Sequence, residues 1–288
     1  MYRAKQAGGG RFEVFDKHLE VCVTSQQERE RELRTALDKR LFAFRYQPIY
    51  RLATGKLEGF ESLLCLRRAD GTVENFSDLL DVAEETGLSI LLGQETFDAV
   101  CAQLRSWSDR LPQQGLLVTI NLTRRQLYHH DLIAQLKKAL AASGADPSRL
   151  IFEAPENAFN ENPDAAVAIL QRLADCQVRV AVDEFGSSLA PLNYLVNLPV
   201  SMVKLAPRLT MSAVSKGRQQ AVTESLIRLG YTLGVEVVAQ GIETLEQLTK
   251  LVRMGCALGQ GPLLSAALEP AQALEHARTG YWTIVPKA

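Results

Sequence analysis

Several features that would place a protein in a special class are missing from this 288-residue sequence. No apolar run reaches the roughly 18 residues that a membrane-spanning helix needs, and the chain does not start with the basic and then apolar pattern of a secretory signal. The five cysteines are odd in number and include no Cys-x-x-Cys pair, which indicates reduced, mostly buried thiols. We therefore expect a soluble, cytoplasmic protein, and any membrane anchor would lie outside this chain.

The sequence also lacks an excess of charge of either sign. Its 32 lysines and arginines stand against 33 aspartates and glutamates, which leaves a formal charge of -1. Without a net positive field, neither nucleic acid nor an anionic membrane surface is an expected partner. Hydrophobic residues make up 47% of the chain, which is enough for a sizeable core, so function has to be inferred from local sites.

The chain divides into three segments. Residues 1–16 hold a helical pattern, a break at three glycines and a short alternating strand, which cannot form a core alone. Residues 17–40 are charged and predict a solvated linker helix. Residues 41–288 alternate apolar strands with helical patterns and predict one large domain.

Eight apolar runs predict the strands of this domain, at residues 44–50, 57–66, 116–121, 150–153, 178–183, 202–204, 235–239 and 258–260. Helical patterns lie between them, at residues 79–86, 95–106, 132–142, 165–174, 219–229 and 245–254. Near-continuous apolar strands in β-then-α order are typical of a parallel barrel whose strands are buried on both faces. A doubly wound open sheet is the alternative, but no Gly-x-Gly-x-x-Gly turn follows the first strand.

Polar residues that suit a hard cation occur where several of these strands end. They are Glu61, Asn121, Glu153, Asp183 with Glu184, and Lys204. The carboxyl ends of barrel strands meet on one face, so these side chains are expected to share a single mouth. Carboxylate and amide oxygens suit Mg²⁺ or Mn²⁺, and a lysine there could hold a phosphate or a metal-bound hydroxide. Without a metal, the carboxylates would repel one another and some would take up protons.

Taken together, seven motifs resemble the ordered signature of EAL domains, the bacterial phosphodiesterases that linearise cyclic di-GMP. The motifs are Tyr46-Gln47-Pro48-Ile49, Glu61-Ser62-Leu63, Ile120-Asn121-Leu122, Asp183-Glu184-Phe185-Gly186, Lys204, Val238-Ala239-Gln240-Gly241-Ile242-Glu243-Thr244 and Gln260-Gly261. The resemblance covers about residues 37–268. Residues 1–16 resemble the last helix and strand of a GGDEF diguanylate cyclase domain, which identifies the chain as the C-terminal part of a GGDEF-EAL protein.

This resemblance implies a TIM-like (β/α)8 barrel with an antiparallel first strand at residues 41–288, and two-metal hydrolysis of cyclic di-GMP to linear pGpG. It places metal ligands at Glu61, Asn121, Glu153, Asp183 and Glu184, and ligand-binding residues at Gln47, Glu61, Leu63 and Gln260. Lys204 corresponds to the lysine near the attacking water, and Glu243 to the glutamate that steadies the loop after Asp183. The implied partners are cyclic di-GMP, a second copy of the chain, and upstream GGDEF or sensor domains.

The chain departs from the family pattern at positions that the resemblance assigns to metal binding and to ligand binding. Gln240 stands where the family has the first glutamate of Glu-Gly-Val-Glu, and Ala206 stands where Lys-Ile-Asp has its aspartate. A neutral amide can orient a water but cannot take its proton. Cys65 replaces an arginine suited to phosphate, and residues 185–192 lack the glycine and tyrosine of Phe-Gly-Thr-Gly-Tyr-Ser-Ser-Leu. We expect Mg²⁺ or Mn²⁺ binding that is weakened or reduced to one ion, and little or no hydrolysis.

Three functions stay open on these grounds. The chain could be a non-catalytic receptor or regulatory domain for cyclic di-GMP, a slow phosphodiesterase, or a partner domain that acts only through dimerisation. Gln47 and the intact Glu61-Ser62-Leu63 favour nucleotide binding, whereas Cys65 and the altered loop argue against tight binding. The histidine pair His129-His130 is expected on the surface, with the two rings pointing in different directions.

Overall fold

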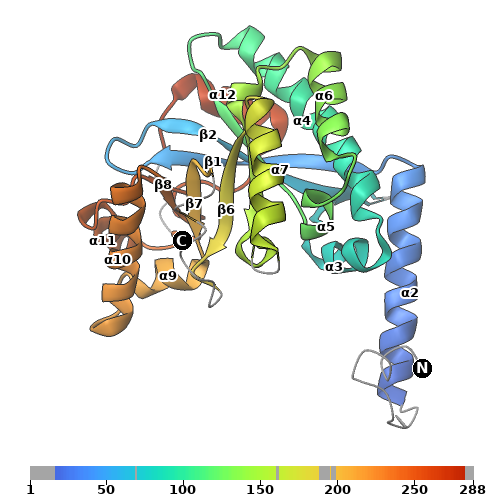
Figure 1. Ribbon diagram of the computed structural model, residues 1–288, viewed down its shortest axis with the longest axis horizontal. Helices are drawn as coiled ribbons and strands as arrows, with labels where there is room; N and C mark the ends of the chain where they lie inside the picture. Colours follow the sequence, from blue (N-terminus) through green and yellow to red (C-terminus); the bar gives the residue numbers. More distant parts are fainter. Residues whose placement is uncertain (1–16, 69, 160–161, 188–194, 196–198, 283–288) are drawn as a thin grey trace.

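The computed structural model describes residues 17–68, 70–159, 162–187, 195 and 199–282. Eight strands close into a barrel, in the order β1, β9, β8, β7, β6, β5, β4, β2, with β1 pairing to β2 to complete the ring. β1 is antiparallel to both of its neighbours, and the other neighbouring barrel strands run parallel. The TIM-like barrel with an antiparallel first strand is therefore confirmed (Figure 1). The barrel strands are β1 Phe42–Arg51, β2 Leu57–Arg67, β4 Leu117–Asn121, β5 Leu150–Pro155, β6 Arg179–Phe185, β7 Met202–Leu205, β8 Glu236–Ala239 and β9 Leu258–Gly259.

Helices cover the outside of the barrel. They are α2 Lys17–Asp38, α3 Ser77–Thr86, α4 Ser89–Arg110, α5 Arg124–Leu127, α6 Leu132–Ser143, α7 Pro163–Asp175, α9 Pro207–Ser212, α10 Arg218–Leu233, α11 Leu245–Arg253 and α12 Pro270–Thr279. Helix α4 begins six residues before the predicted start at residue 95, because Gly93 interrupted the helical pattern. A Cβ atom at Gly93 would lie 2.9 Å from the Gln126 side-chain nitrogen, so the close approach of α5 accounts for this glycine.

A layer of apolar side chains fills part of the barrel, one from each of six strands. It consists of Ile49, Ile151, Ala181, Met202, Val238 and Leu258. A larger cluster packs the outer strand faces against the helices. This two-sided burial explains why the strands read as near-continuous apolar runs.

Strand β2 continues past the barrel, which changes the position of Glu61. β2 pairs with β4 only from Gly59 to Ser62, and beyond this point it pairs with β1 and with the short strand β3 Val73–Asn75. Glu61 therefore lies in the middle of β2 and not at its end. It is nevertheless at the level where β2 leaves the barrel wall, so it still faces the mouth.

The end of α2 is buried on the barrel domain. Leu33 and Ala36 are 0% and 1% exposed, and they pack with residues of β2, α3 and α4 in a second hydrophobic cluster. The expectation of a solvated helix is therefore wrong for this part of α2, although Glu28 and Arg29 are exposed as expected. The rest of the ribbon of α2 projects beyond α3 (Figure 1). The predicted segment 1–16 lies outside the described residues.

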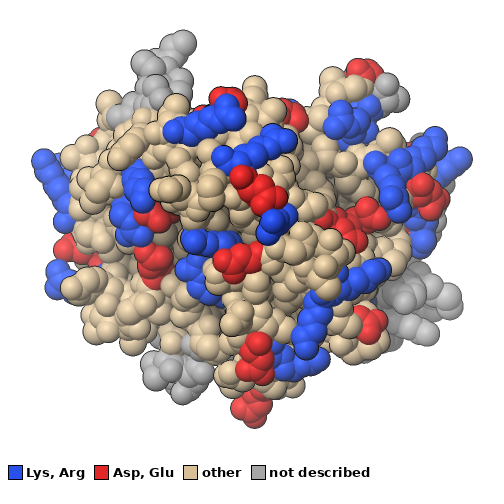
Figure 2. Space-filling model, turned by 90° about the horizontal axis from the view of Figure 1, so that it is seen from above, with Lys and Arg blue, Asp and Glu red and all other residues tan. Residues whose placement is uncertain are grey.

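Positive and negative side chains alternate over the face shown in Figure 2, without a continuous field of one sign. This distribution agrees with the nearly neutral composition. Across the described helices, none combines the length and the apolar character required to span a lipid bilayer.

Candidate active site at the barrel mouth

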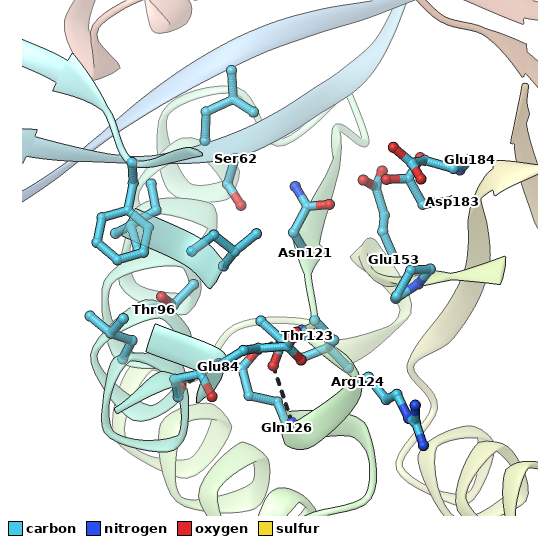
Figure 3. A pocket seen from close by; sticks show the side chains of 18 of the residues that line it. Ser62, Glu84, Thr96, Asn121, Thr123, Arg124, Gln126, Glu153, Asp183 and Glu184 are labelled. Carbon is cyan, nitrogen blue, oxygen red and sulfur yellow. Dashed lines mark hydrogen bonds between the residues drawn. The ribbon is translucent and has the colours of Figure 1, made fainter. Parts of the chain in front are cut away.

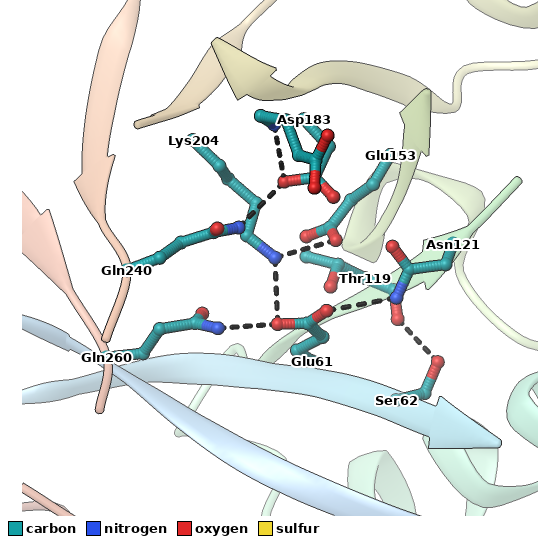
Figure 4. A network of polar contacts seen from close by, with 10 residues as sticks. Glu61, Ser62, Thr119, Asn121, Glu153, Asp183, Lys204, Gln240 and Gln260 are labelled. Atoms are coloured by element: carbon teal, nitrogen blue, oxygen red, sulfur yellow. Dashed lines mark hydrogen bonds and ion pairs between the residues drawn. The ribbon is translucent and has the colours of Figure 1, made fainter. Parts of the chain in front are cut away.

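The candidate site is the polar layer that follows the apolar layer inside the barrel. Side chains on one strand face alternate with a period of two, and four apolar residues are each followed two positions later by a polar one. The pairs are Ile151 with Glu153, Ala181 with Asp183, Met202 with Lys204, and Val238 with Gln240. Leu258 and Gln260 continue the pattern on β9 and the residue after it. The regular strand period therefore brings these groups together (Figure 4).

Lys204 is the centre of this polar layer. Its ammonium group is fully buried and donates hydrogen bonds to Glu61 Oε2 at 2.8 Å and to Glu153 Oε2 at 2.7 Å. Burial opposes the charged form of Lys204, but Glu153 and Glu61 outweigh it and raise the pKa of the lysine. Lys204 is therefore an internal cation held between two carboxylates.

The two carboxylates differ in their remaining partners. Glu61 Oε1 accepts from Asn121 Nδ2 at 2.9 Å, and Glu61 Oε2 accepts from Gln260 Nε2 at 2.5 Å. Burial opposes ionisation, but these donors and Lys204 lower the pKa of Glu61 below its ordinary value. Glu153 Oε1 is buried and has no hydrogen-bond partner among the described residues. Burial, followed by the Glu61 charge, raises the pKa of Glu153 to about 8, so one lysine leaves one of the two carboxylates uncompensated.

Gln240 contacts Asp183 directly. Its Nε2 donates to Asp183 Oδ1 at 2.7 Å, and the backbone N–H of Glu184 donates to the same oxygen at 2.8 Å. A glutamate at position 240 would set a second carboxylate against Asp183, an arrangement that requires a proton or a cation between them. Glu184 itself has φ 53°, a left-handed backbone conformation that a residue with a Cβ adopts at a cost.

The donor set is of the kind that holds a hard cation. Glu61, Glu153 and Asp183 provide carboxylate oxygens, and Asn121 provides an amide oxygen, which are ligand types that Mg²⁺ and Mn²⁺ accept. The unpartnered oxygen of Glu153 is the type of buried polar atom that a cation would satisfy. Asp183 differs from Glu153 in this respect, since its Oδ1 already accepts a hydrogen bond from Gln240 Nε2.

A cleft of about 640 Å³ opens beside the polar layer and runs between β2, α3, α4 and the ends of β4, β5 and β6. Figure 3 shows Glu153, Asp183 and Glu184 at one end, with Glu84 and Gln126 toward the other. Leu63 also lines the cleft. Gln47 pairs directly with Glu61 across β1 and β2, so the two side chains leave the same face. Glu243 follows β8 on an exposed turn, where its backbone N–H donates to Gln247 at 2.8 Å.

Sequence reasoning missed the residues that form the α5 side of the cleft. Thr123 caps α5 in a capping box with Gln126, and Gln126 also donates to the Ser89 backbone oxygen at 2.6 Å. Arg124 brings a positive charge to the same lining. The available signal was Thr123-x-x-Gln126 directly after the strand that ends at Asn121, since this spacing marks a helix start.

Comparison with known proteins decides the family. A sequence profile described as EAL domain matches residues 30–267. The chain belongs to the EAL domain family. It is 30% identical over 274 residues to the bifunctional diguanylate cyclase/cyclic di-GMP phosphodiesterase MucR of Pseudomonas aeruginosa. It is 29% identical over 281 residues to the cyclic di-GMP phosphodiesterase NbdA of the same organism.

The EAL chain covers only part of these relatives. The matches take in 95% and 98% of this chain but 40% of MucR and 36% of NbdA. A solved structure described as the PaMucR phosphodiesterase in complex with c-di-GMP has a TM-score of 0.81 and 30% identity, and the match covers 85% of this chain and 99% of that one. The chain is thus an EAL domain related to cyclic di-GMP phosphodiesterases.

The positions at which this EAL domain departs from the pattern lie in different surroundings. Ala206 is buried directly after β7, where it supplies no oxygen from its side chain. Cys65 is fully buried in β2, and the described lining of the cleft does not include it. Of the altered loop, residues 188–194 lie outside the described part of the chain, whereas Gly186 N donates to Glu156 at 3.2 Å. 

The histidine pair lies in the surface turn before α6, as expected, but the expected direction of the two rings was wrong. The rings of His129 and His130 do not point apart, since their centroids lie only 4.4 Å from each other. Both histidines precede α6, where His130 Nε2 also lies 3.3 Å from Asp131 Oδ2. The turn between α5 and α6 brings the two rings onto the same side.

Proposed function

We propose that this EAL domain binds cyclic di-GMP as a receptor or regulatory domain and hydrolyses it slowly or not at all. The observation that carries the proposal is the bond from Gln240 to Asp183 at 2.7 Å. This hydrogen bond occupies Asp183 Oδ1, an oxygen that a second metal ion would otherwise use as a ligand. The loss of an oxygen ligand at Ala206 acts in the same direction.

Binding is supported by the cleft that remains beside this altered centre. Its volume of about 640 Å³ lies within the range of sites for small ligands, roughly 300–1,000 Å³. The lining combines apolar side chains such as Leu63 and Leu92 with Arg124, which suits the bases and the phosphates of a cyclic dinucleotide. Among the described residues that line the cleft, Arg124 is the only one with a positive side chain, so we expect micromolar affinity and not tighter binding.

The residues of the polar layer have separate tasks in this proposal. Lys204 and Gln260 keep Glu61 ionised and oriented, and Asp183 and Glu153 face the ligand with oxygen atoms. A Mg²⁺ or Mn²⁺ ion bound by Glu61, Asn121, Glu153 and Asp183 would polarise a phosphate oxygen. Gln240 can orient a water by hydrogen bonding, but it has no basic oxygen to take the proton.

A weak phosphodiesterase is the second candidate function. It is favoured by the buried Glu153 oxygen without a partner, since one ion at that position would give part of the metal chemistry. Losing a general base or a metal contribution costs rate by a factor of about 10² or more. We also propose dimerisation, and control by upstream GGDEF or sensor domains. The second of these proposals is made because this chain spans only 40% of MucR.

The proposal is tested by calorimetric titration of cyclic di-GMP, with EDTA and with Mn²⁺, together with chromatographic detection of pGpG. We expect saturable binding in both conditions and no measurable product. Glu61→Ala is expected to weaken binding because it disrupts the polar layer. Glu58→Ala is the matched control, since Glu58 lies on the same strand but pairs with Arg51 at 2.7 Å.

Two outcomes would contradict the proposal in different ways. Turnover that disappears in Glu61→Ala and persists in Glu58→Ala would show an active enzyme. An absence of heat at high micromolar nucleotide would exclude the receptor and leave a role in protein contacts alone.

A further inference from the structure

Some side chains belong both to the wall of the cleft and to the hydrophobic cluster in which the end of α2 is buried. Leu64, Phe76 and Leu92 line the cleft, and the same three residues belong to, or pack against, the cluster that contains Leu33 and Ala36. Phe76 and Leu92 are each 3% exposed, so both side chains are packed between α2 and the cleft. Only one layer of side chains therefore separates α2 from the ligand space.

This small cluster is distinct from the rest of the interior. Its members come from α2, β2, α3 and α4, and in the described part of the chain it has no residue in common with the main cluster around the barrel. Protein interiors are close-packed and transmit displacements to their direct neighbours. A shift of α2 would therefore act first on α3, α4 and the part of β2 beyond Ser62, and not on the main cluster around the barrel.

Polar contacts reinforce the link between α2 and the elements around the cleft. Arg68, directly after β2, pairs with Glu32 of α2 and also with Glu74 of β3 at 2.7 Å. Arg40, just after α2, lies 4.0 Å from Glu95 of α4. These pairs are partly exposed and contribute little stability individually, but they orient α2 against the hairpin and α4.

On the far side of the same wall, α4 is tied to the polar layer. The Ser89 backbone oxygen in the first turn of α4 accepts from Gln126 at 2.6 Å. Gln126 also closes the capping box with Thr123, two residues after Asn121, which donates to Glu61. The wall that α2 supports is thus hydrogen-bonded to Gln126, in the helical turn α5 that follows the strand bearing Asn121.

We propose that docking of α2 and occupancy of the cleft are coupled, so that α2 regulates the affinity of the site for its nucleotide. This inference rests on the proposed function, which supplies cyclic di-GMP as the ligand. Coupling between binding events is reciprocal. Nucleotide therefore stabilises the docked helix, and release of α2 weakens nucleotide binding. A force that acts on the part of α2 that projects beyond α3 (Figure 1) could change the docking of the helix.

The test compares two leucine truncations in the whole chain. Leu33→Ala removes the side chain that α2 inserts into the small cluster, and Leu274→Ala removes a similarly buried leucine of α12 in the main cluster. Calorimetry is expected to show cyclic di-GMP affinity reduced about fivefold or more in Leu33→Ala. Affinity in Leu274→Ala is expected to stay within about twofold of that of the unmodified chain, which controls for general loss of stability.

Hydrogen exchange supplies two further readouts, one without nucleotide and one with it. Without ligand, Leu33→Ala is expected to speed amide exchange in α3 and in the first turns of α4, whereas Leu274→Ala is not. In the unmodified chain, saturating cyclic di-GMP is expected to slow exchange in the last two turns of α2. The second measurement needs no variant, so it remains informative if Leu33→Ala folds poorly.

The possible outcomes distinguish a failure of the proposed coupling from a failure of the proposed function. If the unmodified chain gives no heat with cyclic di-GMP, the proposed function fails, and unchanged exchange of α3 and α4 in Leu33→Ala would independently refute the coupling. If the unmodified chain binds and both truncations retain equal affinity, the receptor stands and regulation through α2 is overturned.

Discussion

At the scale of single residues, an amide in place of a carboxylate reverses the direction of one hydrogen bond. Gln240 donates to Asp183, where a glutamate could only accept or share a cation. Lys204 acts similarly on Glu61 and Glu153, so donors within the chain satisfy much of the negative charge. These internal hydrogen bonds are the reason for proposing that a divalent cation binds weakly at this site.

Restoring the carboxylate should make stability depend on metal. In EDTA, Gln240→Glu is expected to lower the free energy of unfolding by about 2 kcal/mol, because a hydrogen bond to a charged group is lost. Addition of Mn²⁺ should recover part of this loss, as measured by urea unfolding. Gln171→Glu is the control, since Gln171 makes a similar bond to Asp175 on an exposed helix. Equal responses to Mn²⁺ in the two variants would contradict the prediction.

The buried carboxyl of Glu153 predicts a particular pH dependence. Its pKa is raised to about 8 from 4.5, so the folded state holds a proton that the unfolded state releases. The stabilisation is complete below pH 4.5 and is lost as the pH rises through about 8. In EDTA, unfolding free energy should therefore fall between pH 5.5 and pH 8.5 by on the order of 1 kcal/mol or more. Glu153→Gln should flatten this decline, and an unchanged slope would count against the prediction.

At the scale of elements, the connection after β9 positions Gln260. The Ile242 backbone N–H donates to the Gln260 backbone oxygen at 3.1 Å. A Cβ atom on Gly261 would lie 2.2 Å from Ile242 N and 2.4 Å from Ile242 O. The Gln260-Gly261 motif therefore combines a donor for Glu61 with the glycine that lets two backbone segments meet.

Gly261→Ala is expected to separate these segments and to move Gln260 away from Glu61. We expect a loss of about 3 kcal/mol or more in unfolding free energy, because backbone atoms cannot yield as side chains do. Gly255→Ala is the comparison, since its φ is 80° but no atom lies within 4 Å of the added Cβ. It should cost only about 1–2 kcal/mol. Equal losses in chemical denaturation would show that the contact with Ile242 is unimportant.

The sequence predicted the barrel strands well because both of their faces are apolar. It could not give the short edge strand β3, whose three residues carry no period. It predicted the length of β2 but not the point at Ser62 where β2 stops pairing with β4. The polar residues of the layer could be named from strand ends and from the family resemblance. The position of Lys204 between Glu61 and Glu153 depends on the pairing of separate strands, so no local pattern could reveal it.

At the scale of the whole molecule, charge is balanced and dispersed. The formal charge is -1 and the isoelectric point is about 6.5, and both signs intermingle on the face in Figure 2. Such a surface provides little mutual repulsion between copies near neutral pH. Contacts between copies are therefore governed by local surfaces and not by net charge.

This balance predicts a solubility minimum near pH 6.5. Light scattering at fixed concentration should show the strongest attraction between copies at about pH 6.5 and weaker attraction at pH 8.5, where net negative charge grows. The effect should shrink at high salt, since salt screens exposed charges. A minimum that lies several pH units away would contradict it.

Lys204 also gives the fold an internal counter-ion. Its ammonium group offsets one of the two buried carboxylates, and the proton that Glu153 holds because of its raised pKa offsets the other. The barrel can therefore balance its buried charge without a bound ion, and its folding should not require magnesium or manganese in the growth medium.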